Sequence, residues 1–269
     1  FMKTRPMYGI LIALPFLLAG VAYAQTRTPS NPAVIRQNAD VVLDKLWEIR
    51  APYQDWFGLG STERGLTYNP ATGNLIIASR LGGVNPVIVD AGTGVVRGRL
   101  DSTGIAGGTF PYNQIKATAD GQIFTANLTI DSRHEVRIYR WANEESSPER
   151  IFSGRLAEPD SARFGDALGV YGSGDDVTLL LSGTFPGIIA KFAWDGRELV
   201  ESAEFGFPEP VGRGGFSSIT LGGDVYASGT GVAPRAVRLA DGMTKTTLTS
   251  PDITPIDLKS VMHVDIYTG

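Results

Sequence analysis

The sequence has 269 residues, including 33 glycines and 16 prolines, and only 19% of its side chains are charged, which favours an all-β protein with many tight turns over a helical one. It has no cysteine, which excludes disulfides, thiolate metal sites and a cysteine nucleophile. The formal net charge is −4 and the chain has no basic cluster in its sequence, which argues against nucleic acid and anionic membrane surfaces as partners.

Residues 2–24 are predicted to be a secretory signal peptide. They have a basic start, an apolar core over residues 10–21 and a small-x-small cleavage site at residues 22–24. An uncleaved membrane anchor is the alternative, because the apolar core approaches the length of about 18 residues that a spanning helix needs. Pro15 interrupts that core and favours cleavage. We therefore expect a secreted, periplasmic or extracellular protein without membrane contact after removal of the leader.

Residues 25–40 are polar and predict a linker, and residues 41–269 are expected to form the folded domain. The start of that domain, residues 41–49, has apolar positions that fit a helical stripe as well as a strand. The strand is favoured, because a closed propeller, which the following repeats indicate, usually completes its last blade with an N-terminal strand. Since Phe1 precedes Met2 and the chain stops inside another repeat, we expect a domain truncated at its C-terminus.

Residues 63–100 contain four short β-rich runs separated by turn-forming residues. The clearest turn is Asn69–Asn74, which lies between the runs 66–68 and 75–78. The first two runs therefore predict a hairpin. Four short antiparallel strands make one blade of a β-propeller, so this stretch is interpreted as a blade.

The same pattern returns along the chain with the spacing of a propeller. Glycines of the hairpin turns, Gly73, Gly121, Gly174 and Gly223, are 48, 53 and 49 residues apart. Gly73 and Gly121 are expected at turn positions that need positive φ. The sequence predicts an all-β propeller of four-stranded antiparallel blades, with about five represented. An incomplete ring would expose strand edges and favour self-association. The predicted blades are residues 59–104, 105–157, 158–208 and 209–254, with a partial fifth blade from residue 260.

Several short motifs resemble those of a known family. They are residues 63–73 (ERGLTYNPATG), 108–110, 126–129, 138–141 and 163–166. At these motifs the chain is similar to a group of secreted bacterial β-propellers catalogued only as a domain of unknown function, and the resemblance is good over about residues 47–174. It implies secretion and a propeller fold. It implies no reaction and no ligand, because none is assigned to the family.

Residues just before the innermost strand of each blade are expected to gather at one end of the central channel, here called the channel mouth. Glu63, Asn113 and Asp166 carry hard oxygen ligands of the kind that Ca²⁺ prefers, and such a centre would resemble that of sugar-lactonase propellers. In the alternative, which we favour, Glu63 pairs with Arg64 or Arg163 while Asn113 and Asp166 cap turns. The channel-mouth candidates are Glu63, Arg64, Asn113, Gln114, Arg163, Asp166, Arg213, Asp257 and Lys259.

Other residue patterns give weaker evidence for a catalytic or binding site. His134 and His263 fall in different blades and predict no shared metal site, and the serines lack a nucleophile elbow. The four tryptophans lie near strand ends, where they are expected to fill space between blades, with a carbohydrate-stacking platform as the alternative.

These patterns support two functional hypotheses. The favoured one is a non-enzymatic secreted or cell-surface scaffold that presents loops to a protein or a polysaccharide and needs no cofactor. The alternative is a divalent-metal-dependent hydrolase of the sugar-lactonase propeller type, with calcium bound by Glu63, Asn113 and Asp166.

Overall fold

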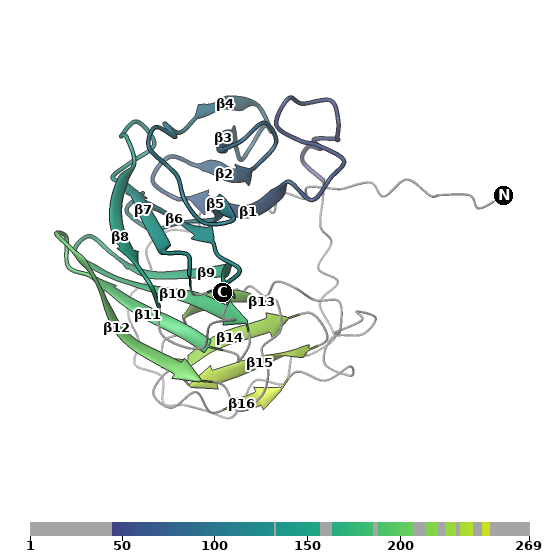
Figure 1. The fold of residues 1–269 in the computed structure, drawn as a ribbon. Coiled ribbons are helices and arrows are strands. Elements are labelled where there is room, and N and C mark those ends of the chain that lie inside the picture. Colours follow the sequence, from purple (N-terminus) through teal and green to yellow (C-terminus); the bar gives the residue numbers. More distant parts are fainter. Residues whose placement is uncertain are drawn as a thin grey trace, which may run out of the picture.

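The computed structural model describes residues 45–131, 133–156, 163–184, 188–206, 214–219, 224–229, 232–238 and 244–247. In these segments the chain is all-β and forms four separate four-stranded antiparallel sheets, which are the blades of a β-propeller (Figure 1). The described segments contain no helix long and apolar enough to cross a membrane. The predicted fold class is therefore confirmed, while the predicted leader, linker and fifth blade lie outside the described residues.

Each predicted blade contains one sheet, and each sheet is a meander in which consecutive strands pair. Blade 1 has strands β1 (Glu63–Asn69), β2 (Asn74–Ser79), β3 (Asn85–Asp90) and β4 (Val96–Arg99). Blade 2 has β5 (Phe110–Ala117), β6 (Ile123–Leu128), β7 (Val136–Trp141) and β8 (Glu149–Gly154). Blade 3 has β9 (Arg163–Ser173), β10 (Asp176–Thr184), β11 (Ile188–Trp194) and β12 (Leu199–Gly206). Blade 4 has β13 (Gly214–Ile219), β14 (Asp224–Gly229), β15 (Val232–Arg238) and β16 (Thr244–Thr247).

The first strand of each blade is the innermost one. Strand β1 lies beside β5, β5 beside β9, and β9 beside β13, and so the four first strands follow one another around the centre (Figure 1). The approach of β1 to β5 is close at Gly65, where a Cβ atom would come 2.8 Å from the backbone nitrogen of Ile115. A glycine at this position therefore lets neighbouring blades meet.

Apolar side chains between the blades form the core. Ile76, Ile115 and Trp141 belong to a cluster between blades 1 and 2, and Phe124, Leu179 and Phe192 to one between blades 2 and 3. Burying each large apolar side chain stabilises the fold by about 1.5–3 kcal/mol. Three of the four tryptophans are buried, as the space-filling interpretation predicts: Trp56, Trp141 and Trp194.

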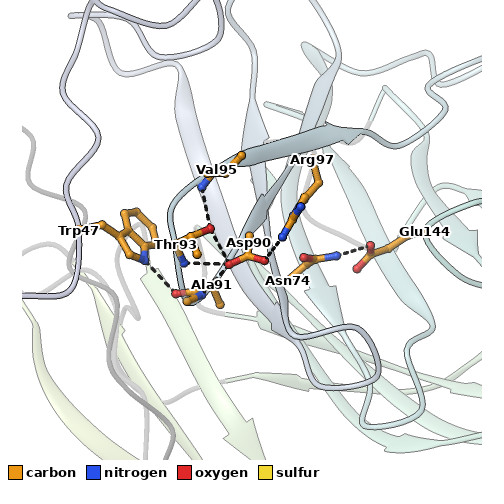
Figure 2. Close-up of polar contacts among 9 residues, drawn as sticks. Trp47, Asn74, Asp90, Ala91, Thr93, Val95, Arg97 and Glu144 are labelled. Atoms are coloured by element: carbon orange, nitrogen blue, oxygen red, sulfur yellow. Dashed lines mark hydrogen bonds and ion pairs between the residues drawn. The ribbon is translucent and has the colours of Figure 1, made fainter.

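The described part of the N-terminal segment does not form the strand that was expected to complete a blade. Residues 45–49 form no strand, and residues 41–44 lie outside the described part of the chain. Ile49 and Trp56 instead pack on Val87 and Val89 of blade 1, and the Trp47 indole donates a 2.9 Å hydrogen bond to the carbonyl of Ala91 (Figure 2). The segment thus covers an apolar face of blade 1, and burial of that face replaces the expected backbone pairing.

The turns that follow the innermost strands lie opposite the channel mouth, at an end here called the hairpin end. Gly73, Gly121 and Gly174 have φ values of 73°, 91° and 60°, which confirms the expected positive φ at the first two. Gly223 lies outside the described residues.

Side chains at the hairpin end connect successive blades. Glu144 of blade 2 accepts a hydrogen bond from Asn69 of blade 1 at 2.7 Å. It also accepts one from Asn74 of blade 1 at 2.8 Å (Figure 2). Between blades 2 and 3, Gln122 donates to the carbonyl of Gly174 at 2.8 Å, and the Gly174 amide donates to Asp120 at 2.9 Å. The turn motif of the sequence repeat is therefore part of the contact between blades.

Candidate functional site at the channel mouth

The structure places the described channel-mouth candidates at the starts of three adjacent innermost strands. Glu63 and Arg64 begin β1, Asn113 and Gln114 lie in β5, and Arg163 and Asp166 lie in the first part of β9. The remaining candidates, Arg213, Asp257 and Lys259, lie outside the described residues.

Asn113 is a buried link between blades. Its side chain has no solvent exposure, its Nδ2 donates a 2.6 Å hydrogen bond to the carbonyl of Gly165, and its Oδ1 accepts a 3.2 Å hydrogen bond from Arg80. Both ends of the amide are thus used by the protein, as a buried polar group requires.

The neighbouring amide, Gln114, links the three innermost strands β1, β5 and β9. Its Nε2 donates to the carbonyl of Arg64 and to the carbonyl of Asp166, each at 2.9 Å. Because one nitrogen bonds both carbonyls, the backbones of β1 and β9 are held close to each other on either side of β5. Asn113 and Gln114 together brace the channel mouth.

Asp166 forms a two-pronged ion pair with Arg163. The Arg163 Nε and Nη2 atoms lie 2.5 and 2.8 Å from the two carboxylate oxygens, and the Asp166 side chain is only 5% exposed. The hydrogen bond to Asp166 raises the pKa of the Arg163 guanidinium above its ordinary value. This geometry is the strongest form of carboxylate recognition by an arginine.

Glu63 is held by uncharged donors. Its Oε1 accepts hydrogen bonds from the Thr62 hydroxyl at 2.7 Å, and from the Gly58 amide and the Ser79 hydroxyl at 3.3 Å each. The expected ion pair of Glu63 with Arg64 or Arg163 is not formed, and Arg163 pairs with Asp166 instead.

The three residues of the calcium hypothesis lie in adjacent innermost strands, but protein donors contact one oxygen of Glu63, the oxygen of Asn113 and both oxygens of Asp166. The Asn113 oxygen faces Arg80, and both Asp166 oxygens face Arg163. Within the described segments no group of three His, Cys, Asp or Glu residues is placed to hold a metal ion. Calcium binding at Glu63, Asn113 and Asp166 stays a prediction, and a cation there would have to displace guanidinium groups of like charge.

Arg80, which the sequence did not single out, completes the channel mouth. It follows β2, donates to the carbonyl of Ser61 at 3.1 Å, and lies over the Phe110 ring with 3.9 Å between guanidinium carbon and ring centre. Burial, and then the positive charges of Arg64 and Arg163, lower the pKa of Arg80. No sequence motif marks this residue, because only the return of β2 to the channel mouth brings it there.

A small half-open pocket of about 220 Å³ lies beside Arg80, between blades 1 and 2. Its walls are mainly apolar, and the Phe110 side chain at its side is 40% exposed. The pocket is lined by Thr62, Arg80, Gly83, Val84, Phe110, Pro111 and Tyr112.

Comparison with known proteins supports the fold. No protein-family model matches the sequence, and no curated protein sequence matches it. Among solved structures, the chain is similar to a DUF4623 family protein from Bacteroides eggerthii, with 19% identity and a TM-score of 0.58 over 69% of this chain. The match covers 44% of that protein, so this chain spans less than half of its length. At this identity the likeness concerns the fold alone, and it agrees with the predicted resemblance to bacterial propellers of unknown function.

Two weaker similarities have TM-scores below 0.5 and carry no argument. One is to a nidogen/laminin complex, with 11% identity and a TM-score of 0.48 over 75% of this chain and 67% of that one. The other is to a gluconolactonase from Xanthomonas campestris, with 18% identity and a TM-score of 0.35 over 69% of this chain and 75% of that one.

Proposed function

We propose that this chain is a non-enzymatic secreted or cell-surface β-propeller that acts as a binding or structural scaffold. The observation that supports this function is the use of the channel-mouth residues as braces between blades. Asn113 and Gln114 bind the backbones of neighbouring strands, and Asp166 is held by Arg163. A row of blades braced in this way presents its connecting loops in fixed positions, which suits recognition of a partner.

The same contacts disfavour hydrolysis. A hydrolase of the metal-dependent type needs oxygen ligands for the ion and an open position for an activated water. At the channel mouth both oxygens of Asp166 accept from Arg163, and the Asn113 oxygen accepts from Arg80. We therefore favour binding, with a protein or a polysaccharide at the cell surface as the partner, over the calcium-dependent reaction.

Calcium titration tests the proposal. Calorimetry with CaCl₂ should detect no stoichiometric binding, and the melting temperature of the wild type should be the same with and without millimolar calcium. Glu63→Gln is the test variant, and Glu135→Gln, at an exposed glutamate, is its matched control. Hydrolysis of δ-gluconolactone with calcium present should stay at the uncatalysed rate.

Stabilisation of the fold by calcium would support the hydrolase instead. A bound ion at a hundredfold excess over its dissociation constant would stabilise the fold by about 2.7 kcal/mol. If calcium raised the melting temperature of the wild type and of Glu135→Gln but not of Glu63→Gln, and the lactone were hydrolysed, the scaffold proposal would fall and the hydrolase would replace it.

A further inference from the structure

Among the described residues of the channel mouth, positive charge exceeds negative charge. The guanidinium groups of Arg64 and Arg163 act on that of Arg80, and the carboxylates of Glu63 and Asp166 provide the negative charge near it. Asp166 is fully engaged by Arg163. Within the described part of the chain neither Arg64 nor Arg80 forms an ion pair with a carboxylate. Two arginines therefore have no anionic partner among the described residues.

These two arginines still have unused hydrogen-bonding capacity. The Nε of Arg64 is buried and has no hydrogen-bond partner among the described atoms. Arg80 is fixed by Ser61, Asn113 and the Phe110 ring, and these contacts use two of its five N–H donors. A guanidinium that is held in place and partly desolvated is suited to two-pronged recognition of a carboxylate, because little side-chain freedom is lost on binding.

The pocket beside Arg80 adds an apolar surface to this charge. Val84, Phe110 and Pro111 line it, and its volume of about 220 Å³ lies below the range of about 300–1,000 Å³ typical of sites that enclose a drug-sized ligand. Tyr112 also lines the pocket, and its buried hydroxyl has no partner in the described structure. The pocket therefore fits one ring of a larger ligand whose remaining units lie outside.

We propose that Arg80 and Arg64 bind the carboxylate of a uronate residue in an acidic polysaccharide, with the sugar ring against Phe110, Val84 and Pro111. This inference rests on the proposed binding function and names its ligand class. A uronate offers an anionic group and a ring with C–H faces on one rigid unit. The side chain of an acidic peptide offers the carboxylate without such a ring, and it would leave the apolar wall uncovered.

The test compares three probes by calorimetry on the whole chain: hexagalacturonate, its fully methyl-esterified form, and a poly-glutamate peptide. Hexagalacturonate should bind, the ester should bind at least tenfold more weakly, and poly-glutamate should not compete. Arg80→Gln should weaken hexagalacturonate binding by about tenfold to a hundredfold, the range that a charged hydrogen bond is worth. Arg64→Gln should weaken it in the same direction, and added salt should weaken binding to the wild type.

Matched variants separate lost recognition from lost folding. Arg99→Gln removes an exposed arginine of β4 that pairs with Asp55 and should bind hexagalacturonate like the wild type. Arg80→Lys keeps the charge but removes the two-pronged geometry, and it should bind more weakly than the wild type while still melting in one cooperative transition. Equal binding of the acid and the ester, preference for poly-glutamate, or unchanged affinity in Arg80→Gln and Arg64→Gln would overturn the inference.

The same samples distinguish this inference from the proposed function. New reducing ends after incubation with hexagalacturonate, with the arginine dependence retained, would refute the non-enzymatic function and leave the uronate site standing. Binding of the methyl ester with no preference for the acid would refute the uronate site and leave the binding function standing.

Discussion

The two ends of the innermost strands are built from the same kind of contact but are left in different electrostatic states. At the hairpin end, Glu144 accepts from Asn69 and Asn74, and Asp120 accepts from the amide of Gly174. At the channel mouth, Asn113 and Gln114 bind backbone carbonyls of neighbouring strands. Polar side chains thus connect the blades at both ends.

The difference lies in what remains after these contacts are made. Glu144 and Asp120 of the hairpin end are matched by donors from the adjacent blade, whereas among the described residues of the channel mouth Arg64 and Arg80 have no carboxylate partner, and a pocket lies beside Arg80. Contacts that only hold blades together would leave no such excess of positive charge. The comparison therefore agrees with a structural role for the hairpin end and with the proposal that the channel mouth serves both structure and recognition.

The largest effect is expected from a glycine of the channel mouth. Gly165 has a φ of +99°, and a Cβ there would lie 2.1 Å from the carbonyl oxygen of Asn127. Gly165→Ala should lower the free energy of unfolding by about 3 kcal/mol or more, since strain and a backbone clash add. Gly73→Ala is the control at the hairpin end, where no atom lies within 4 Å of the added Cβ. It should cost about 1–2 kcal/mol.

Urea denaturation followed by tryptophan fluorescence measures both variants. Equal losses for Gly165→Ala and Gly73→Ala would show that the close approach of β9 to β6 does not limit stability.

The second prediction compares the amide braces of the two ends. Asn113→Ala leaves the Gly165 carbonyl and an Arg80 N–H unpaired, and Gln122→Ala leaves Asp120 and the Gly174 carbonyl short of a donor. Each should lower the free energy of unfolding by about 1–3 kcal/mol. Because the two sites are at opposite ends of the strands, the double variant should show the sum within about 0.5 kcal/mol.

Binding then separates the two braces. Asn113→Ala should weaken hexagalacturonate binding, because it releases Arg80, whereas Gln122→Ala should leave it unchanged. Equal effects of both variants on binding would contradict the assignment of recognition to the channel mouth alone.

A third prediction concerns the acid that unites blades 1 and 2 at the hairpin end. Glu144→Ala removes the acceptor of Asn69 and Asn74 and should lower the free energy of unfolding by about 1–2 kcal/mol. Glu145→Ala, at the adjacent exposed glutamate, should change it by less than about 0.5 kcal/mol. Thermal melting of both variants provides the measurement, and similar melting temperatures would show that the Glu144 contacts are not stabilising.

The smallest effect is a pH dependence at the β3–β4 turn of the hairpin end. Hydrogen bonds from Arg97 and Thr93 hold the pKa of Asp90 at about 2, below its ordinary value of 3.8 (Figure 2). A lowered pKa in the folded state means that the ionised form stabilises the fold above the ordinary pKa, and that this contribution is lost as the pH falls toward 2. The melting temperatures of the wild type and Asp90→Asn should therefore converge between about pH 5 and pH 2. A difference in melting temperature that stays constant with pH would contradict the lowered pKa of Asp90. Arg97→Gln removes one of the hydrogen bonds that lower this pKa, so its melting temperature should also approach that of the wild type as the pH falls, but from a smaller difference.

Much of the fold was predictable because propeller repeats are local in sequence. The turn Asn69–Asn74 and the glycines at Gly73 and Gly121 identify hairpins through backbone conformations that few other residues adopt, and their recurrence indicates the blades. The strand expected at residues 41–49 was wrong over its described part, because its apolar residues allow either pairing at an edge or packing on a face. Local pattern does not distinguish these two ways of burying the same side chains.

The candidate site was predictable in position but not in chemistry. The sequence by itself predicted that Glu63, Asn113 and Asp166 lie near the starts of adjacent innermost strands, since the repeat period places them there. Only the tertiary structure decided that Arg163 takes both oxygens of Asp166, that Asn113 faces Arg80, and that neither Arg64 nor Arg80 pairs with a carboxylate among the described residues. The physical reason is that charge balance at the channel mouth depends on distances between blades, and residues about fifty positions apart meet there only after the blades have packed.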